Sequence, residues 1–575
     1  MLKKGRIVPA SVLLALLGIL LASCGGDSTN IPPKQNQVTY NYQTPAQSGG
    51  TLLYSDWQFP DSDNPLFSTS AVDDELLNAL YGQPFVVTSD GRLLPDQLAE
   101  IPTQANGDVS KDGLIVTLKL NPNLKWSDGQ PLTSADFMYY IKTLLDPATG
   151  APSTTGFDPH TLASYTAPDA HTLILKYAKV FTPFLFYLPY ALPEHAWGNI
   201  PNKALMSTQD VNLAPTVTSG PYMVQDYADG QSITMVPNKF YASTSLHPTT
   251  LNKLVFKGYQ SKNALITGYE AGQTDHAEGF TVDDLPSLKR LPGLQVTPAT
   301  EYEHLDPNLA NPVLRDLNVR KAIEQAINRC QMIQSLLQQP CNKLSVNQLE
   351  PPPNPDSDPS IKELPFDLKA AKNDMKAAGW DCSSNPCTKN GQPFPTLNLV
   401  TTNSSKLRQD ATQIIKADLA KLGIPINLDH QYYPAASLFG NYSSNGILAT
   451  GKYDLALFAY SPSLDSDRNL YPSFDSSQIP SVSNPAGQNY SQVQDPKVDK
   501  LLEEGRTTID PSKRSNVYKQ LQKYLIQQVY SIPLYLRPNI TLTNGKLGNY
   551  FPNPITQENE WDIGEWWQRG AHGAH

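Results

Sequence analysis

Hydrophobic residues alternate with polar ones before residue 121 and recur at helical spacing after residue 133. The alternation predicts a half-buried β-strand, and its buried face comprises Leu114, Val116, Leu118 and Leu120. Asp128-Gly129 is typical of a turn, and Thr133 with Asp136 has the spacing of a helix capping box. The apolar stripe of the following helix comprises Phe137, Tyr140, Ile141, Leu144 and Leu145. Asp146-Pro147 then ends a predicted strand, turn and helix.

The same two periodicities continue along the chain and predict an α/β fold. Strands are expected at residues 50–54, 172–176 and 453–460, and Ser70 with Asp73 predicts the start of a helix. The helix expected at residues 318–329 has an apolar stripe of Ala322, Ile323, Ala326 and Ile327, which predicts packing against a core.

An aromatic run at residues 181–188 fits neither period. It is apolar on every side, Pro183 interrupts it and Pro189 follows it. Such a run is more often a buried core segment than a surface that stacks against a ligand. We therefore predict that it is core.

The amino-terminal end has the pattern of a lipoprotein signal peptide. A short basic region precedes an apolar run at residues 7–20, which is too short to span a bilayer comfortably. Leu21-Ala22-Ser23-Cys24 looks like a bacterial lipobox, so residues 1–23 are expected to be removed and Cys24 to carry a lipid. Residues 24–49 are mostly Gly, Ser, Thr, Asn, Gln and Pro, which predicts a flexible tether. The body is then extracytoplasmic, in a periplasm or at the outer face of the cytoplasmic membrane, and is anchored by lipid alone.

Length and charge restrict the remaining possibilities. The chain has 575 residues, too many for one core, so two or three lobes are expected. It contains 50 Pro and 34 Gly but is 39% hydrophobic, which indicates a loop-rich globular protein. A formal net charge of −10 argues against nucleic acid or an anionic membrane surface as a partner.

Four cysteines remain after Cys24, an even number in an oxidising compartment. Their gaps do not repeat the spacing of a structural zinc site, so no metal site is expected. Short loops favour disulfides between Cys330 and Cys341 and between Cys382 and Cys387, with free thiols as the alternative.

Several motifs occur in the order found in one protein family. They are Trp126-Ser127-Asp128-Gly129, Gly220-Pro221-Tyr222, the helix at residues 318–329, Phe366-Asp367-Leu368, Asp495-Pro496 and Ser531-Ile532-Pro533-Leu534-Tyr535. This order resembles the extracytoplasmic solute-binding proteins of peptide and nickel ABC importers, the oligopeptide/dipeptide-binding family, solute-binding family 5. The resemblance implies a three-lobe periplasmic-binding-protein fold, class II-like with an extra inserted lobe. The ligand cleft would lie between two bodies joined by hinge strands.

The resemblance also implies the order of the lobes along the chain. Lobe I is expected at residues 50–90 and 215–304, with lobe II inserted at residues 91–214. Lobe III is expected at residues 305–533, and residues 534–575 are expected to return to lobe I and end in a tail.

Five residues are candidates for ligand contact. Trp57, Tyr302 and Tyr460 are expected near the cleft, where they either stack against a ligand or pack in the core. In peptide binders of the family, the loop after the strand at residues 453–460 carries two small residues and an Asp that pairs with the α-amino group of the peptide. Here Ser461 follows the strand, but no Asp has the expected spacing. Either Asp465 replaces that Asp, or the ligand lacks a free amino terminus, or Asp465 caps a surface turn.

The sequence favours a binding protein over an enzyme. It has no G-x-S-x-G, H-E-x-x-H or P-loop motif, and its nine histidines are scattered, two of them, His572 and His575, in a Gly-Ala tail. We therefore expect a monomer without a cofactor that captures a peptide-like or other small solute and delivers it to an ABC permease with cytoplasmic ATPase subunits. A secreted, lipid-anchored hydrolase of peptide or glycan is the alternative, and an adhesion or scaffold protein is a more distant one.

Overall fold

The computed structural model describes residues 39–45, 48–68, 70–151, 156–556 and 558–569. The signal peptide, Cys24, most of the predicted tether and the two tail histidines lie outside these residues. Within the described part of the chain, no helix combines the length and the apolar character needed to cross a membrane.

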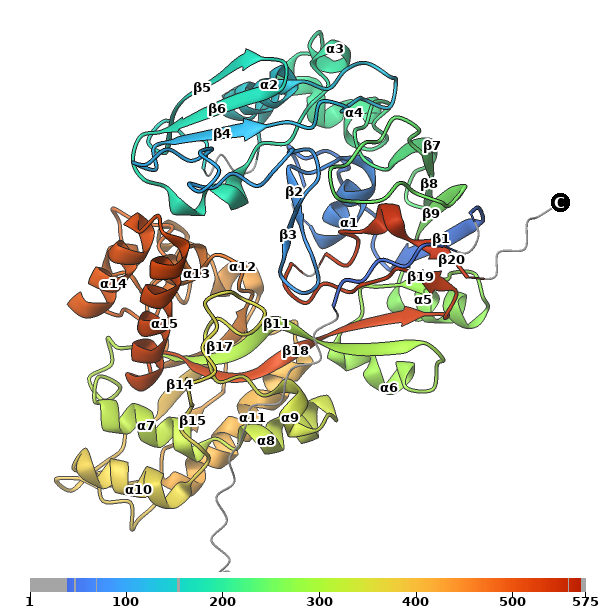
Figure 1. Cartoon of the computed structure of the whole chain (residues 1–575). Helices are drawn as coiled ribbons and strands as arrows, with labels where there is room; N and C mark the ends of the chain where they lie inside the picture. The colour runs from blue at the N-terminus through green and yellow to red at the C-terminus, as the bar shows by residue number, and fades with distance from the viewer. Residues whose placement is uncertain (1–38, 46–47, 69, 152–155, 557, 570–575) are drawn as a thin grey trace, which may run out of the picture. The chain divides into compact units, whose positions relative to one another are not determined.

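A mixed sheet of 11 strands joins segments from both ends of the chain. The strand order is β15-β14-β17-β11-β18-β10-β1-β9-β8-β7, and β16 pairs with β14 (Figure 1). The first strand, β1, is parallel to β9 and β10, whereas β18 is antiparallel to β10 and β11. The strands are β1 (Thr51–Asp56), β7 (Tyr222–Ala228), β8 (Ser232–Pro237), β9 (Lys253–Gly258), β10 (His276–Ala277), β11 (Leu294–Pro307), β14 (Leu397–Thr402), β15 (Ile426–Asn427), β16 (Tyr432–Tyr433), β17 (Leu455–Tyr460) and β18 (Ile532–Thr543).

A separate three-stranded sheet contains the unit predicted at residues 114–146. Its strands are β4 (Ile115–Lys119), β5 (Leu162–Asp169) and β6 (Thr172–Tyr177), in the order β4-β6-β5, and it is accompanied by helix α2 (Ser134–Leu145). The predicted capping box is present, because the Asp136 carboxylate accepts a hydrogen bond of 2.7 Å from the Thr133 N–H. In the preceding turn Gly129 has φ +90°, and a Cβ there would lie 3.0 Å from the Phe240 ring. The strand, turn and helix predictions are therefore confirmed.

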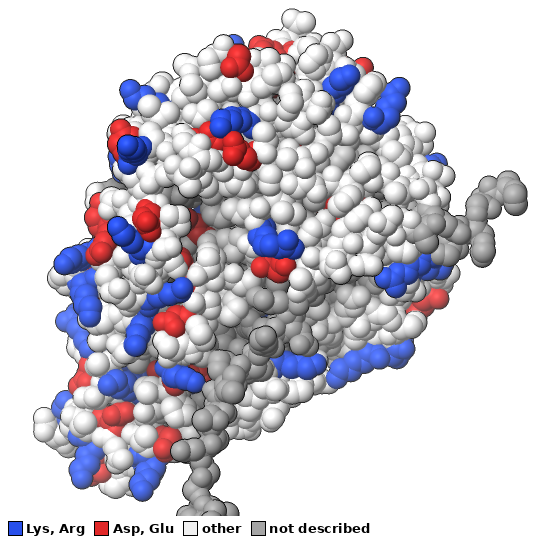
Figure 2. Space-filling view, viewed as in Figure 1, with Lys and Arg blue, Asp and Glu red and all other residues white. Residues whose placement is uncertain are grey.

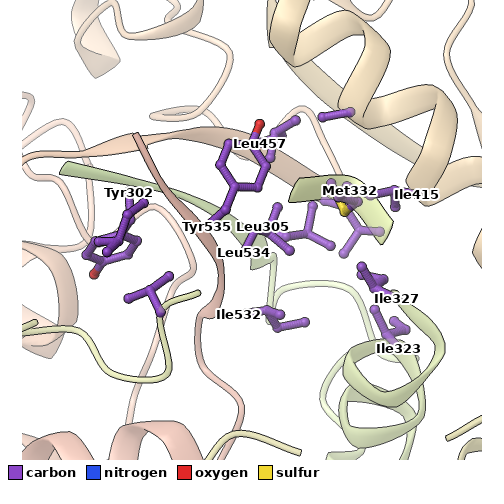
Figure 3. Close-up of a cluster of buried hydrophobic side chains, with 14 of the residues drawn as sticks. Tyr302, Leu305, Ile323, Ile327, Met332, Ile415, Leu457, Ile532, Leu534 and Tyr535 are labelled. Atoms are coloured by element: carbon purple, nitrogen blue, oxygen red, sulfur yellow. The ribbon is translucent and has the colours of Figure 1, made fainter. Parts of the chain in front are cut away.

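The largest hydrophobic cluster surrounds the half of the sheet formed by β14, β17, β11 and β18. Figure 3 shows Leu305, Leu457 and Leu534 from three adjacent strands facing side chains from α7 and from the segment that follows it. The predicted stripe Ala322, Ile323, Ala326 and Ile327 is at most 1% exposed, as expected for core residues. The longer helices are α1 (Ala71–Leu80), α5 (Lys262–Glu270), α7 (Leu317–Ala326), α10 (Leu368–Ala377), α11 (Lys406–Leu422), α13 (Ser466–Phe474), α14 (Pro496–Thr507) and α15 (Pro511–Gln527).

Strands β11 and β18 form a long antiparallel ribbon (Figure 1). The pairing register shifts in the middle of this ribbon. Pro298 lies opposite Pro538, and the regular register resumes only at the pair Tyr302 and Leu536. Because proline has no N–H, neither partner can donate a ladder hydrogen bond at this point. The ribbon therefore consists of two hydrogen-bonded halves with a weakly paired middle.

The four cysteines of the body lie in the pairs that the sequence favours. Cys330 and Cys341 have a Cα–Cα distance of 5.0 Å, and Cys382 and Cys387 one of 4.2 Å. Their sulfur atoms are at bonding distance in both pairs. Each disulfide would close a short local loop, so neither would fix the arrangement of distant segments.

The end of the predicted tether is packed rather than free. The Tyr40 hydroxyl lies 2.9 Å from a Glu565 carboxylate oxygen, and the Tyr42 ring stacks on His247 with centroids 3.6 Å apart. The expectation of a flexible segment as far as residue 49 is therefore wrong for residues 39–45. The segment has few aliphatic residues, so these contacts with the body come from two tyrosine rings.

The charged residues are well mixed on the face shown in Figure 2. Lys and Arg side chains alternate there with Asp and Glu side chains over most of the charged area. A surface of this kind produces no strong field of a single sign on that face.

Candidate ligand-binding site

Two adjoining cavities lie at the carboxyl end of β17. Their volumes are about 320 Å³ and about 580 Å³. Both are lined by Tyr460, Ser461, Ser473 and Gln488, so the two spaces meet at the loop after β17. Cavities of this size hold small organic ligands or short peptides.

The smaller cavity has aromatic walls and one polar corner. The rings of Tyr302 and Tyr460 lie 5.7 Å apart, and burial raises the pKa of both phenols. In the polar corner, His304 Nε2 is 3.3 Å from an Asp306 carboxylate oxygen. His304 Nδ1 and the other Asp306 oxygen are buried without a partner among the described residues. A bound polar group could satisfy both atoms, because unpaired buried polar atoms are costly.

The larger cavity is lined by segments that are far apart in the sequence. One wall is formed by residues 83–87, at strand β2 (Phe85–Val87). A second wall is formed by residues 185–190, which overlap the predicted aromatic run and the short helix η2 (Thr182–Tyr187). Another wall is formed by residues 460–464, 468 and 469, and Ile555, Thr556 and Glu558 complete the lining. The prediction that residues 181–188 form a buried core is wrong, since only Pro183 is fully buried and Leu185, Phe186 and Leu188 line the cavity. A half-buried cavity wall and a core segment are both rich in apolar residues, so the sequence alone does not show which of the two residues 181–188 form.

Asp465 fixes the loop after β17, which forms one wall of this cavity. Its carboxylate accepts hydrogen bonds from the N–H groups of Asp467 and Arg468 and so caps α13. It also forms a two-pronged ion pair with the Arg514 guanidinium, at 2.9 and 3.0 Å. The surface-turn interpretation is therefore correct about the cap but wrong about exposure, because Asp465 is 4% exposed. A role for Asp465 in ligand binding stays a prediction. A ligand cation would have to compete for its carboxylate with the Arg514 guanidinium and with the two backbone N–H groups.

Glu350 ties a second loop to the same helix. Its carboxylate accepts hydrogen bonds from the Asn354 and Asn469 side-chain amides, at 2.7 and 2.8 Å. Burial raises the pKa of this carboxyl well above its usual value. Asn469 in turn lines the larger cavity, so Glu350 holds one of its polar wall groups in place.

The larger cavity has one basic and one acidic side chain in its walls. Arg468 is exposed and has no carboxylate partner among the described residues; its guanidinium lies 5.2 Å from the centre of the Tyr187 ring. Glu558 lines the cavity together with Ile555 and Thr556. Burial, and then the nearby Asp74 carboxylate, raise the pKa of Glu558 to about 7. The cavity therefore offers a cation on one wall and a titratable acid on another.

The structure brings together three of the five candidate ligand residues. Tyr302 lines the smaller cavity, and Tyr460 and Ser461 line both. Trp57 instead donates its indole N–H to the Gly279 carbonyl at 3.0 Å and lies under the Lys262 ammonium. Sequence reasoning missed Arg468 and Glu558, since no motif marks either residue.

Comparisons with known proteins agree with this architecture. Residues 96–481 match the family described as bacterial extracellular solute-binding proteins, family 5 Middle. The oligopeptide-binding protein AppA of Bacillus subtilis is 24% identical over 98% of this chain and 99% of its own length. Its structure in complex with a nonapeptide has a TM-score of 0.65 at 22% identity, covering 91% of this chain and 99% of that one. The structure of HbpA2 from Haemophilus parasuis has a TM-score of 0.75 at 18% identity, covering 90% of this chain and all of that one.

Proposed function

Because this chain belongs to the bacterial extracellular solute-binding proteins of family 5, we propose that it captures a peptide-like solute and delivers it to the permease of an ABC importer. The pair of adjoining cavities at the end of β17 carries this proposal. Apolar side chains dominate several of their walls, and a few polar groups converge on the space, which is the usual composition of a small-molecule site. The oligopeptide-binding name of the Bacillus subtilis relative supports a peptide as the solute.

Capture without chemical turnover is part of the proposal. His304 pairs with Asp306, but among the described lining residues no serine hydroxyl is hydrogen-bonded to His304, whose Nδ1 has no partner, so the nucleophile and base of a hydrolase are not paired. Mass spectrometry of the ligand that co-purifies with the full chain tests the substrate class. Incubation of the purified protein with peptide and glycan panels tests turnover. Intact peptides in the bound fraction support the proposal, whereas steady production of cleavage products would favour the hydrolase alternative.

Binding of a peptide with a free amino terminus should depend on the ionisation of Glu558. Its carboxyl is neutral below about pH 7 and negative above it, so a ligand ammonium gains an ionic partner as the pH rises. We expect affinity to increase about fivefold between pH 6 and pH 7, because the ionised fraction of Glu558 rises by about that factor while the α-amino group of the peptide stays mostly protonated. Titration calorimetry at several pH values measures the effect.

Two variants separate this contribution of Glu558 from general effects of pH. Glu558→Gln should show nearly constant affinity over the same range. Glu503→Gln, at an exposed acidic position that lines neither cavity, should behave as the wild type. A pH-independent affinity in the wild type would remove Glu558 from ligand recognition.

Ligand capture should also close the protein. Since the larger cavity is lined by segments far apart in the sequence, a ligand that touches opposite walls stabilises the form in which these walls are close. Small-angle scattering should then show a smaller radius of gyration at saturating peptide. An unchanged radius with peptide demonstrably bound would contradict closure.

Membrane attachment should depend on Cys24. We expect Cys24→Ala to yield an unlipidated precursor, because the lipobox cysteine is the only proposed attachment point for lipid. Metabolic labelling with a fatty acid, compared with labelling of Cys382→Ala as a cysteine control, measures this. Equal labelling of Cys24→Ala and wild type would contradict the anchor.

A further inference from the structure

A cluster of buried ionisable groups lies where segments from both ends of the chain meet. His276 is in β10, between β1 and β18, and Glu278 follows that strand directly. Glu560 comes from the carboxyl-terminal segment. One ligand atom of each residue lies within 4.8 Å of the other two, and His276 and Glu560 are completely buried. The three groups thus converge from separate parts of the chain.

This cluster contains more acid than the surrounding protein neutralises. The buried carboxyl groups of Asp56 and Glu75 lie close enough to interact with it electrostatically. Among the described residues, the ion pairs of the three clustered groups consist of the single contact between His276 Nε2 and Glu278, at 2.7 Å. One oxygen of Glu560 is buried without any hydrogen-bond partner. A buried carboxylate oxygen in this state lacks the compensation that such groups normally have.

We propose that His276, Glu278 and Glu560 bind one divalent metal ion, and that zinc fits them best. An imidazole nitrogen with two carboxylate oxygens is a ligand set used for zinc, with a water molecule able to complete the coordination. Calcium and magnesium prefer oxygen ligands alone, so His276 argues against both.

Neighbouring residues orient the three side chains by hydrogen bonds, as the residues around a metal site orient its ligands. His276 Nδ1 is 2.8 Å from the Thr543 hydroxyl, which leaves Nε2 to face the two carboxylates. The Asn559 amide donates to one Glu278 oxygen at 2.6 Å. The Tyr54 hydroxyl lies between the Glu75 carboxylate and Glu560, 3.1 Å from the Glu560 oxygen that is not the unpartnered one. Such contacts orient metal ligands and are often as important as the ligands.

Metal binding would change two contacts of the cluster. The ion would replace the hydrogen bond between His276 Nε2 and a Glu278 oxygen, which are 2.7 Å apart. It would also give the unpartnered Glu560 oxygen a partner.

The metal would fasten the carboxyl-terminal segment to the sheet. Glu560 follows Glu558 by two residues, and Glu558 lines the larger cavity. His276 and Glu278 belong to the sheet side of the site. The ion thus has a structural role that is independent of which solute the cavity takes.

The test uses the full chain, which is unfolded in the presence of a chelator to remove bound metal and is then refolded with or without zinc. We expect about one tightly held zinc per chain by elemental analysis, and a melting temperature several degrees higher in the zinc-bound protein. Glu560→Gln keeps the shape of the side chain and should fold, but it replaces the carboxylate by an amide, which is a much poorer zinc ligand. This variant should lose both the bound zinc and the stabilisation by zinc.

Two control variants exclude other sources of zinc binding. Glu350→Gln alters an equally buried carboxyl outside the cluster and should keep the metal. A double variant, His572→Ala with His575→Ala, should also keep it. Should Glu560→Gln fail to fold, cobalt substitution of the wild type decides, because a site with one histidine and two carboxylates gives visible absorption bands that zinc abolishes. Failure of the wild type to retain zinc, or equal retention by folded Glu560→Gln, would overturn the proposal.

Discussion

Replacing Ser461 by tryptophan is expected to weaken peptide binding at least about 100-fold, equivalent to about 2.7 kcal/mol. Ser461 is the first residue after β17, is exposed and lines both cavities. A tryptophan side chain at this junction occupies space that the ligand needs and separates the two cavities. The free energy of unfolding should change little, since exposed substitutions away from special contacts have small effects.

Titration calorimetry and thermal melting of the same preparation measure these two outcomes. Ser483→Trp is the matched control, because Ser483 is an exposed serine that lines neither cavity. It should bind peptide as the wild type does. Unchanged affinity in Ser461→Trp would mean that the solute binds elsewhere on the protein.

Replacing Arg514 by methionine should lower the free energy of unfolding by about 3–5 kcal/mol, the usual cost of leaving one member of a buried ion pair unpaired. The pair with Asp465 is nearly dry, since the Arg514 and Asp465 side chains are 15% and 4% exposed. Methionine preserves most of the apolar stem but provides no partner for the carboxylate. Because Asp465 also caps α13, the loss should reach the cavity wall and weaken peptide binding as well.

Arg290→Met provides the comparison for this variant. Arg290 also pairs with an acid, Glu270, but its side chain is 68% exposed, so its loss should cost at most about 1 kcal/mol. Urea unfolding of both variants, followed by peptide binding under native conditions, separates stability from affinity. Equal, small losses in the two variants would contradict the structural role assigned to the Arg514 pair.

Local sequence patterns predicted the helices and strands well, because the residues that stabilise these elements are close together in the sequence. The capping box of Thr133 and Asp136, and the buried stripe of α7, depend on residues close in sequence, and both are present. The resemblance to a family supplied the order of the elements, and it directed attention to Tyr460 and Ser461. The lobe boundaries drawn from it stay predictions.

The site was less predictable because tertiary contacts decide it. Asp465 resembled an exposed turn residue, but its partner Arg514 is 49 residues away and no local pattern links them. Glu558 is one acid in a segment without periodicity, and only folding places it beside the cavity. The half-buried aromatic run has no period that distinguishes a cavity wall from a core.

The proline pair in the middle of the β11–β18 ribbon has a mechanical consequence. Pro298 and Pro538 leave a stretch without ladder hydrogen bonds, so the resistance of the ribbon to bending is lowest there. A joint with low stiffness lets the two halves of the ribbon change their mutual angle while the pairing within each half stays intact. If the solute closes the protein as proposed, little elastic energy opposes this closure, and most of the energy gained from contacts with the solute remains available as affinity.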